Sequence, residues 1–406
     1  MRRPISVNLM VKVMTLPDSE ILNSIVSRVF RYDDVTMGDP ARGFFLRYRG
    51  ELLRDSVEAY DQLAEALRPY DITPLFRLEE GFQMVLLVRG TVHPKPSKVW
   101  VNILLFVLTV LSVMFAGAVS SYKGPVPKDA LAGIWVLITH LWVGWPFALS
   151  LMAILVAHEF GHYFTGRARG AAVTLPYFIP FPFSPIGTMG AFIQMKSVPK
   201  NKRALFDLAI AGPLAGLVVA IPVLLYGLSQ SSLGTVVPTP GMFTEGNSVL
   251  YLLAKFVVFG KLLPAPANLS GLPLLFHWIS FFFIGQPSTV GSTDVFISPV
   301  AWAGWVGLLV TFLNLIPAGQ FDGGHVIYTV FGKRVNRIVP VILIVTILLG
   351  FLWSGWWLWA FLIFLLGRSH AEPLDQITQL DPRRKALAVL MLVIFLLVLA
   401  PVPFIT

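Results

Sequence analysis

The 406-residue chain contains no cysteine and few charged residues. The lack of cysteine excludes disulfide bonds and thiolate ligands, so any metal ion must be held by histidine and carboxylate side chains. Charged residues make up only 13% of the chain and hydrophobic residues 55%, and the mean hydropathy is +0.72. Soluble proteins of this length are much less apolar. The composition therefore predicts a polytopic α-helical membrane protein.

Acidic residues are scarce beyond the first quarter of the chain. Residues 1–98 hold 14 of the 31 Lys and Arg and 13 of the 22 Asp and Glu. The net charge of +9 therefore comes almost wholly from the apolar remainder, where basic residues in loops set membrane orientation, and this argues against nucleic-acid binding. Residues 1–17 lack the apolar core of a signal peptide, so we expect a cytosolic N-terminus.

Residues 1–98 have the alternating patterns of a small cytosolic α/β domain. We expect two helices and three strands in it, at 18–30 and 55–68 and at 44–49, 73–79 and 82–89. Pro94 and Pro96 indicate a linker into the membrane. No residue of this domain points to chemistry.

Apolar segments long enough to cross a bilayer follow this domain. We expect about 6–7 transmembrane helices, at 99–122, 147–163, 208–228, 297–316, 338–367 and 386–405. We divide the membrane part into a membrane-embedded core at 99–332 and C-terminal transmembrane helices at 333–406. The run at 338–367 has basic residues at both ends, which favours two short crossings that turn near Ser354 and Gly355.

Basic residues also set the topology of the central segments. Arg167 and Arg169 follow the segment at 147–163 and place its end in the cytosol, which predicts a multi-pass protein of the cell membrane. Residues 249–259 and 272–284 lie in a stretch with few cations. We expect them outside, at the membrane surface or re-entrant, and a helical hairpin that dips into the membrane is the alternative.

One polar motif interrupts the segment at 147–163. His158, Glu159 and His162 form the string HEFGH, and the twelve residues before it are almost entirely apolar. Histidines four apart lie on one face of a helix and can bind one metal ion, while the adjacent carboxylate can take a proton from a metal-bound water. The alternative is a pair of core histidines that are hydrogen-bonded to neighbours.

Two histidines leave a catalytic zinc site one protein ligand short, because such sites usually have three. Asp322 is a candidate, since it follows an apolar segment that reaches the same membrane depth. Pro317 and Gly319 break that helix, so the backbone can aim the carboxylate sideways. An ordinary turn aspartate is the alternative, and Asp207 is a rival ligand.

Two further polar residues lie near Asp322 in the sequence. Asn314 can hydrogen-bond a neighbouring helix, or it can donate to the oxyanion of a tetrahedral intermediate if it lies about 3 Å from that oxygen. His325 can be a ligand, a partner of a ligand or a helix cap.

Residues 188–195, TMGAFIQM, have strand character beside a proline-rich loop. A substrate helix hides its amide bonds, so it must unwind and be bound in an extended form before a carbonyl can be reached. We expect this strand to bind substrate by adding it as an edge strand, through Gly190, Ala191, Phe192 and Ile193. An ordinary hairpin packed on the helices is the alternative.

HEFGH in a membrane helix, followed by an N-x-x-P-x-x-x-x-D-G string in a later one, resembles the site-2 protease family of intramembrane zinc metalloproteases. The likeness extends from the first apolar segment to about Gly332. It includes AGPLAG at 211–216, and the loop and strand that contain LPYFIPFPF and GTMGAFIQMKS.

This resemblance implies one zinc ion per chain, with His158, His162 and Asp322 as its ligands. It implies Glu159 as the catalytic base and Asn314 as a transition-state stabiliser. The expected activity is hydrolysis of peptide bonds in or near the transmembrane segment of a membrane-anchored protein, with release of a regulator, which is regulated intramembrane proteolysis.

Two other functions stay open. A metalloprotease of soluble or surface substrates would carry its motif on a helix that rises into the cytosol, whereas here the apolar run continues to His158. A zinc transporter or sensor would bind the metal without hydrolysis and would not need Glu159.

Overall fold

The computed structural model describes residues 17–38, 43–91, 96–237, 244–285, 291–367 and 372–405. The chain is mostly helical and divides into two compact units. Unit 1 consists of Met1–His93 and Pro373–Gln379, and unit 2 consists of Pro94–Glu372 and Leu380–Thr406.

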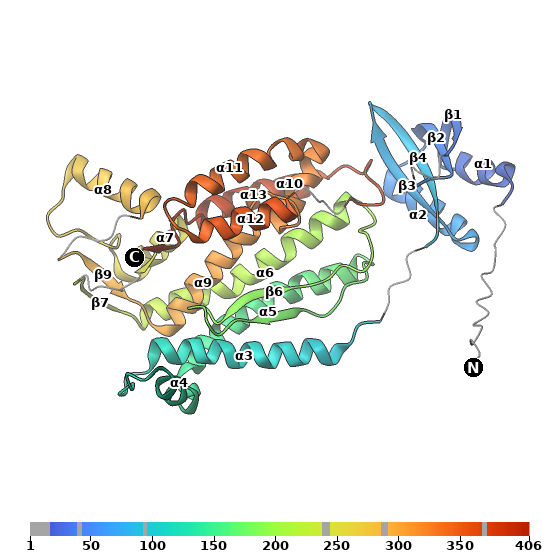
Figure 1. Ribbon diagram of the computed structural model, residues 1–406. Helices are drawn as coiled ribbons and strands as arrows, with labels where there is room; N and C mark the ends of the chain where they lie inside the picture. Colours follow the sequence, from blue (N-terminus) through green and yellow to red (C-terminus); the bar gives the residue numbers. More distant parts are fainter. Residues whose placement is uncertain are drawn as a thin grey trace, which may run out of the picture. The chain divides into compact units, whose positions relative to one another are not determined.

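Unit 1 is a four-stranded antiparallel sheet with two helices (Figure 1). The strand order is β1-β2-β4-β3. Both expected helices and the three expected strands are present, and a fourth strand, β1, is additional. The elements are α1 (Ser19–Ser27), β1 (Phe30–Met37), β2 (Leu46–Leu52), α2 (Ser56–Leu67), β3 (Ile72–Glu79) and β4 (Phe82–Arg89).

The outer edge of β3 is covered by Pro373–Gln379, a segment from far along the chain. The Phe76 N–H donates to the Leu374 carbonyl at 2.9 Å, and the Gln376 N–H donates to the Phe76 carbonyl at 3.0 Å. Leu374 and Ile377 pack against the core of unit 1. The segment therefore protects an edge strand that would otherwise expose unpaired backbone groups.

The side chain of Asp375 stabilises a turn within this segment. This side chain is fully buried and accepts from the N–H groups of Ile377 and Thr378 at 2.8 and 3.1 Å and from the Thr378 hydroxyl. We expect Asp375→Ala to lower the free energy of unfolding of unit 1 by about 1–3 kcal/mol, because the N–H groups lose their acceptor. Thermal unfolding measured by circular dichroism checks this, and an unchanged melting temperature would contradict it.

Within the described residues, three helices of unit 2 are long and apolar enough to cross a membrane. Each was expected from the sequence: α3 (Val99–Ser121), α5 (Trp145–Ala168), which follows a short 3-10 turn, and α6 (Lys202–Ser229). Figure 1 shows them side by side, with α9 (Pro299–Asn314) packed against α5 and α6.

The other helices described in unit 2 are shorter. The expected break within residues 338–367 is confirmed, because α11 ends and α12 begins on either side of residues 350–354. The two pieces expected at 249–259 and 272–284 are also helices. The full number of membrane crossings stays a prediction. These helices are α4 (Ala130–Thr139), α7 (Val249–Phe259), α8 (Gly271–Ile284), α10 (Asp322–Phe331), α11 (Val339–Leu349), α12 (Gly355–Leu366) and α13 (Pro382–Val398).

In the part of unit 2 that the structure describes, three two-stranded sheets lie between these helices. The hairpin of β5 (Tyr177–Pro180) and β6 (Thr188–Phe192) lies along α3, because Asn102 donates to the Leu175 and Pro176 carbonyls and Ser112 donates to the Gly187 carbonyl. The other two sheets pair β7 (Ser232–Thr235) with β9 (Thr293–Phe296), and β8 (Thr244–Glu245) with β10 (Phe404–Ile405).

Glycines let α6 approach its two neighbours closely. A Cβ at Gly161 would lie 2.6 Å from the Ala211 carbonyl oxygen, and a Cβ at Gly304 would lie 2.6 Å from the Leu224 Cα. Such contacts are typical of membrane helices, where small residues let backbones meet. The close packing of α5, α6 and α9 fixes the relative positions of the polar groups between them.

Candidate metal centre

The HEFGH motif lies in the buried middle of α5. His158, Glu159 and His162 have exposed fractions of 3%, 4% and 6%. His158 is 13 residues beyond the start of α5 at Trp145, or about 20 Å along the helix axis. The polar groups are therefore enclosed well inside an apolar helix, where each must find a partner.

Three side chains from two distant parts of the chain meet at this point. The His158 and His162 Nε2 atoms lie 3.2 Å apart, and they lie 3.5 and 3.3 Å from the Asp322 Oδ2 atom. A zinc ion held tetrahedrally at about 2.0–2.1 Å separates its ligand atoms by roughly 3.3 Å. The three observed distances match this value, so the donor set fits a tetrahedral zinc ion and leaves one position open.

Asp322 reaches the histidines because the chain breaks between α9 and α10. The first helix ends at Asn314 and the second begins at Asp322, as expected from Pro317 and Gly319, and Gly319 has a φ of +50°. Gly323 lies so close to the Leu315 carbonyl that any side chain there would overlap it. The tight turn therefore requires glycine directly after the acidic residue.

The neighbouring helix α6 orients His162. The His162 Nδ1 atom lies 2.8 Å from the Leu208 carbonyl oxygen. Because a carbonyl can only accept, Nδ1 carries a proton, so Nε2 is the atom of the neutral imidazole that has a lone pair for a metal ion. The imidazole rests on Gly212, where a Cβ would overlap the ring, and His158 rests on Gly216.

The remaining polar candidates take different places. The Asn314 Nδ2 atom lies 3.4 Å from the His158 Nε2 atom, so its amide points at the centre. His325 is buried, but among the described residues the ligand atoms that gather here come only from His158, His162 and Asp322. Asp207, the rival ligand, is paired instead with Arg169 and Arg384.

The expected substrate strand is partly formed. Gly190, Ala191 and Phe192 belong to β6, whereas Ile193 lies one residue beyond it. One edge of β6 pairs with β5, and among the described residues no strand pairs with its other edge. A Cβ built at Gly190 meets no atom within 4 Å, so there is open space on that face of the strand.

Two contributors to the centre were not predicted as such. The Leu208 carbonyl gives no side-chain signal in a sequence, and the glycines at 212 and 216 were interpreted only as a packing face. Pro213 lies inside α6, but its missing N–H removes the helix partner of the Ala209 carbonyl rather than that of Leu208, so it does not indicate this contact.

Comparison with known proteins gives concordant results. A model described as Peptidase family M50 matches residues 146–353. Probable zinc metalloprotease EGY2, chloroplastic, of Oryza sativa subsp. indica is 27% identical over 399 residues, which cover 94% of this chain and 66% of that protein. Probable zinc metalloprotease EGY1, chloroplastic, of Oryza sativa subsp. japonica is 28% identical over 429 residues, with 95% and 68% covered. The chain thus spans about two thirds of the length of these relatives.

The matched residues contain both strings that converge in the structure, HEFGH on α5 and the segment from Asn314 to Asp322. The family model also covers more than half of the chain. The chain therefore belongs to peptidase family M50, the site-2 protease family.

Proposed function

We propose that the chain is an intramembrane zinc metalloendopeptidase, which hydrolyses peptide bonds in or near the transmembrane segment of membrane-anchored proteins. The main support is the buried triangle of ligand atoms, whose sides of 3.2, 3.3 and 3.5 Å suit one tetrahedral zinc ion. A site with three protein ligands and one open position is typical of catalytic rather than structural zinc.

In this proposal His158, His162 and Asp322 hold one zinc ion per chain. When bound, zinc acidifies a coordinated water and polarises the carbonyl that is to be cleaved. The Leu208 carbonyl keeps His162 in the tautomer that leaves Nε2 free to bind. Two neutral imidazoles and one carboxylate leave a net positive charge on the occupied site, which favours a developing oxyanion.

Glu159 and Asn314 act on the substrate. The Glu159 carboxylate lies on α5 beside His158 and takes the proton from the attacking water, which it later gives to the nitrogen of the leaving amine. The Asn314 Nδ2–H group donates to the oxygen of the carbonyl under attack. Burial of the centre excludes other water, so both interactions act in a medium of low dielectric constant.

The substrate is held as an extended strand along β6, through Gly190, Ala191, Phe192 and Ile193. An extended segment exposes its carbonyls, whereas a helix hides them. The Gln194 carbonyl accepts from the Thr174 N–H at 3.0 Å and so faces the β5 side. Because backbone groups alternate along a strand, the N–H of Ile193 faces the opposite, open edge.

We expect Ile193→Pro to lower cleavage at least tenfold with unchanged zinc content, because proline removes one N–H from the open edge and leaves the β5 pairing intact. Cleavage of a single-span substrate in vesicles, followed on gels, measures the effect. Ile193→Val keeps the N–H and should retain activity. Full activity of Ile193→Pro would dispose of strand addition while leaving the hydrolase proposal standing.

The membrane setting completes the proposal. The chain has 6–7 transmembrane helices in the cell membrane and a cytosolic N-terminus, with an N-terminal domain at 1–98, a protease core at 99–332 and C-terminal helices at 333–406. The basic residues that follow α5 support this orientation. Cutting near the cytosolic surface then releases the soluble part of an anchored regulator.

Removal and return of the metal tests the function directly. Purified protein in vesicles is incubated with a library of single-span proteins before and after zinc is removed with a chelator. Fragments should appear only with metal present and should return when zinc is restored. Cleavage that persists in metal-free protein, or the absence of any fragment across the library, would count against a zinc peptidase.

A further inference from the structure

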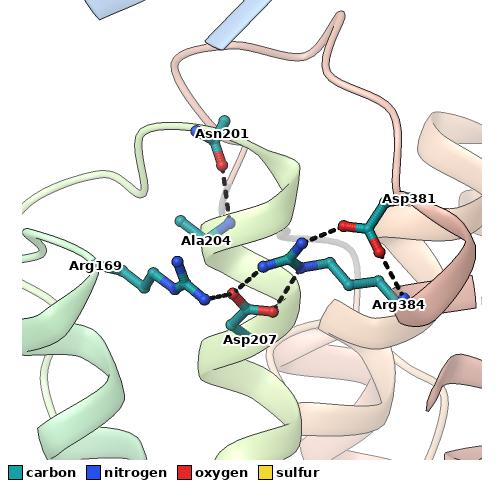
Figure 2. A network of polar contacts seen from close by, with 6 residues as sticks. All are labelled: Arg169, Asn201, Ala204, Asp207, Asp381 and Arg384. Atoms are coloured by element: carbon teal, nitrogen blue, oxygen red, sulfur yellow. Dashed lines mark hydrogen bonds and ion pairs between the residues drawn. The ribbon is translucent and has the colours of Figure 1, made fainter.

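Asp207, on α6, forms ion pairs with arginines at the ends of α5 and α13 (Figure 2). Its carboxylate accepts from Arg384 through two parallel bonds, Nε to Oδ1 and Nη2 to Oδ2, both 2.7 Å long. The Arg169 Nη2 atom lies 2.6 Å from the same Oδ2 atom. The Asp207 side chain is 13% exposed, so this is a partly buried, two-pronged ion pair with defined geometry.

Each partner of Asp207 comes from a different helix. Arg169 is the residue directly after α5, seven positions beyond His162. Arg384 lies in the first turn of α13, where Asp381 caps the helix by accepting from the Arg384 N–H at 2.9 Å and also contacts the Arg384 guanidinium. These bonds from Arg384 hold the pKa of the Asp381 carboxyl below its usual value, so Asp381 stays charged.

Asp207 is also adjacent to the group that orients His162. The next residue along α6 is Leu208, whose carbonyl accepts from His162 Nδ1. Gly212, one turn further, leaves room for the imidazole against the helix. A displacement of the Leu208 carbonyl by about 1 Å directly away from His162 would stretch this 2.8 Å bond beyond hydrogen-bonding distance. The position of α6 against α5 therefore controls the hydrogen bond that orients the His162 ring.

We infer that Asp207 and Arg384 are positioning residues for the metal centre. The ion pairs fix α6 against the ends of α5 and α13, so that the Leu208 carbonyl stays aligned with His162. This inference rests on the proposed zinc site. Replacing a residue that orients a metal ligand typically lowers metal affinity or activity by 10–100-fold.

The test compares wild type with Asp207→Asn, Arg384→Gln and the double variant, each purified as the full chain. Zinc affinity is measured by competition with a chromophoric chelator, and ligand geometry by the visible spectrum of the cobalt-substituted protein. We expect each single variant to weaken zinc binding about tenfold and to alter the spectrum, and the double variant to be no worse. In the cleavage assay kcat should fall while KM is retained, because β6 is untouched.

Two further variants exclude a general effect of charge or folding. Lys333→Gln removes the exposed Lys333–Glu372 ion pair of the same unit and should leave zinc affinity unchanged. Arg384→Lys keeps the charge but loses the two parallel bonds, and it should behave like Arg384→Gln. Wild-type zinc affinity and spectrum in folded Asp207→Asn or Arg384→Lys would overturn the inference. A wild-type protein that binds no zinc would instead refute the proposed function itself.

Discussion

Replacing Gly212 with alanine is expected to abolish zinc binding and cleavage together. A Cβ at this position would overlap the His162 imidazole, with Nε2, Cδ2 and Cε1 as the nearest atoms. The ring cannot simply move aside, because its Nδ1 atom is hydrogen-bonded to the Leu208 carbonyl and α5 packs closely on α6. One methyl group would therefore displace a metal ligand, and we expect zinc occupancy to fall to about a tenth of the wild-type value or less.

Two other positions on α6 provide a graded comparison. A Cβ at Gly216 would lie 3.2 Å from His158 Nδ1, a tight contact that a small shift can relieve, so Gly216→Ala should have a weaker effect. Val218 is 73% exposed on the same helix, and Val218→Ala should bind zinc normally. Measuring the zinc content of the three purified variants checks whether it rises from Gly212→Ala through Gly216→Ala to Val218→Ala. Normal zinc content in Gly212→Ala would show that His162 is not held as described.

Glu159→Gln is expected to lose cleavage by about 10²–10⁴-fold while zinc content stays at the wild-type level. Glutamine has nearly the same shape, so the buried site should keep its packing, but it cannot take up a proton. The side chain is 4% exposed and lies beside a ligand rather than among the three ligand atoms. Glu159→Gln should therefore abolish proton transfer, and with it cleavage, without affecting zinc binding.

The same variant distinguishes a hydrolase from a protein that only carries or senses zinc. A transporter does not need a proton acceptor next to its ligands, so its function would survive the change. The measurement is zinc content together with the fragments formed in vesicles, with His158→Ala as the variant that loses both. Glu159→Gln protein that still cuts substrate would exclude the catalytic role of this carboxylate.

Much of the metal centre could be predicted because its parts have side-chain signatures. Histidines at positions 158 and 162 must share a helix face, and a helix break followed by an acidic residue near position 322 predicts a carboxylate aimed sideways. The Leu208 carbonyl could not be predicted, because every residue has one. The pairing of Asp207 with Arg384 joins residues 177 positions apart, and no local pattern indicates such a partner.

In the fold as well, features set by the local sequence could be predicted, whereas features set by distant partners could not. The break within residues 338–367 follows from the charges at its ends, and the structure places it at residues 350–354. Strand β1 was not predicted because Asp33 and Asp34 are unfavourable in strands, and its pairing with β2 is irregular between Tyr32 and Asp34. The segment at 373–379 has no helical or alternating pattern of its own, and its backbone pairing depends on the distant strand β3.

Unit 1 is built from two segments that are far apart in the chain, and this affects how its role can be studied by truncation. A shortened chain that begins after His93 would still contain Pro373–Gln379, now without the strand that binds it. Leu374 and Ile377 would lose their apolar cover and face solvent, and Asp375 would hold a turn with nothing to pack on. Deleting the first 93 residues therefore has two effects, because it removes most of unit 1 and also exposes Pro373–Gln379. Any defect must be compared with a chain that lacks both segments.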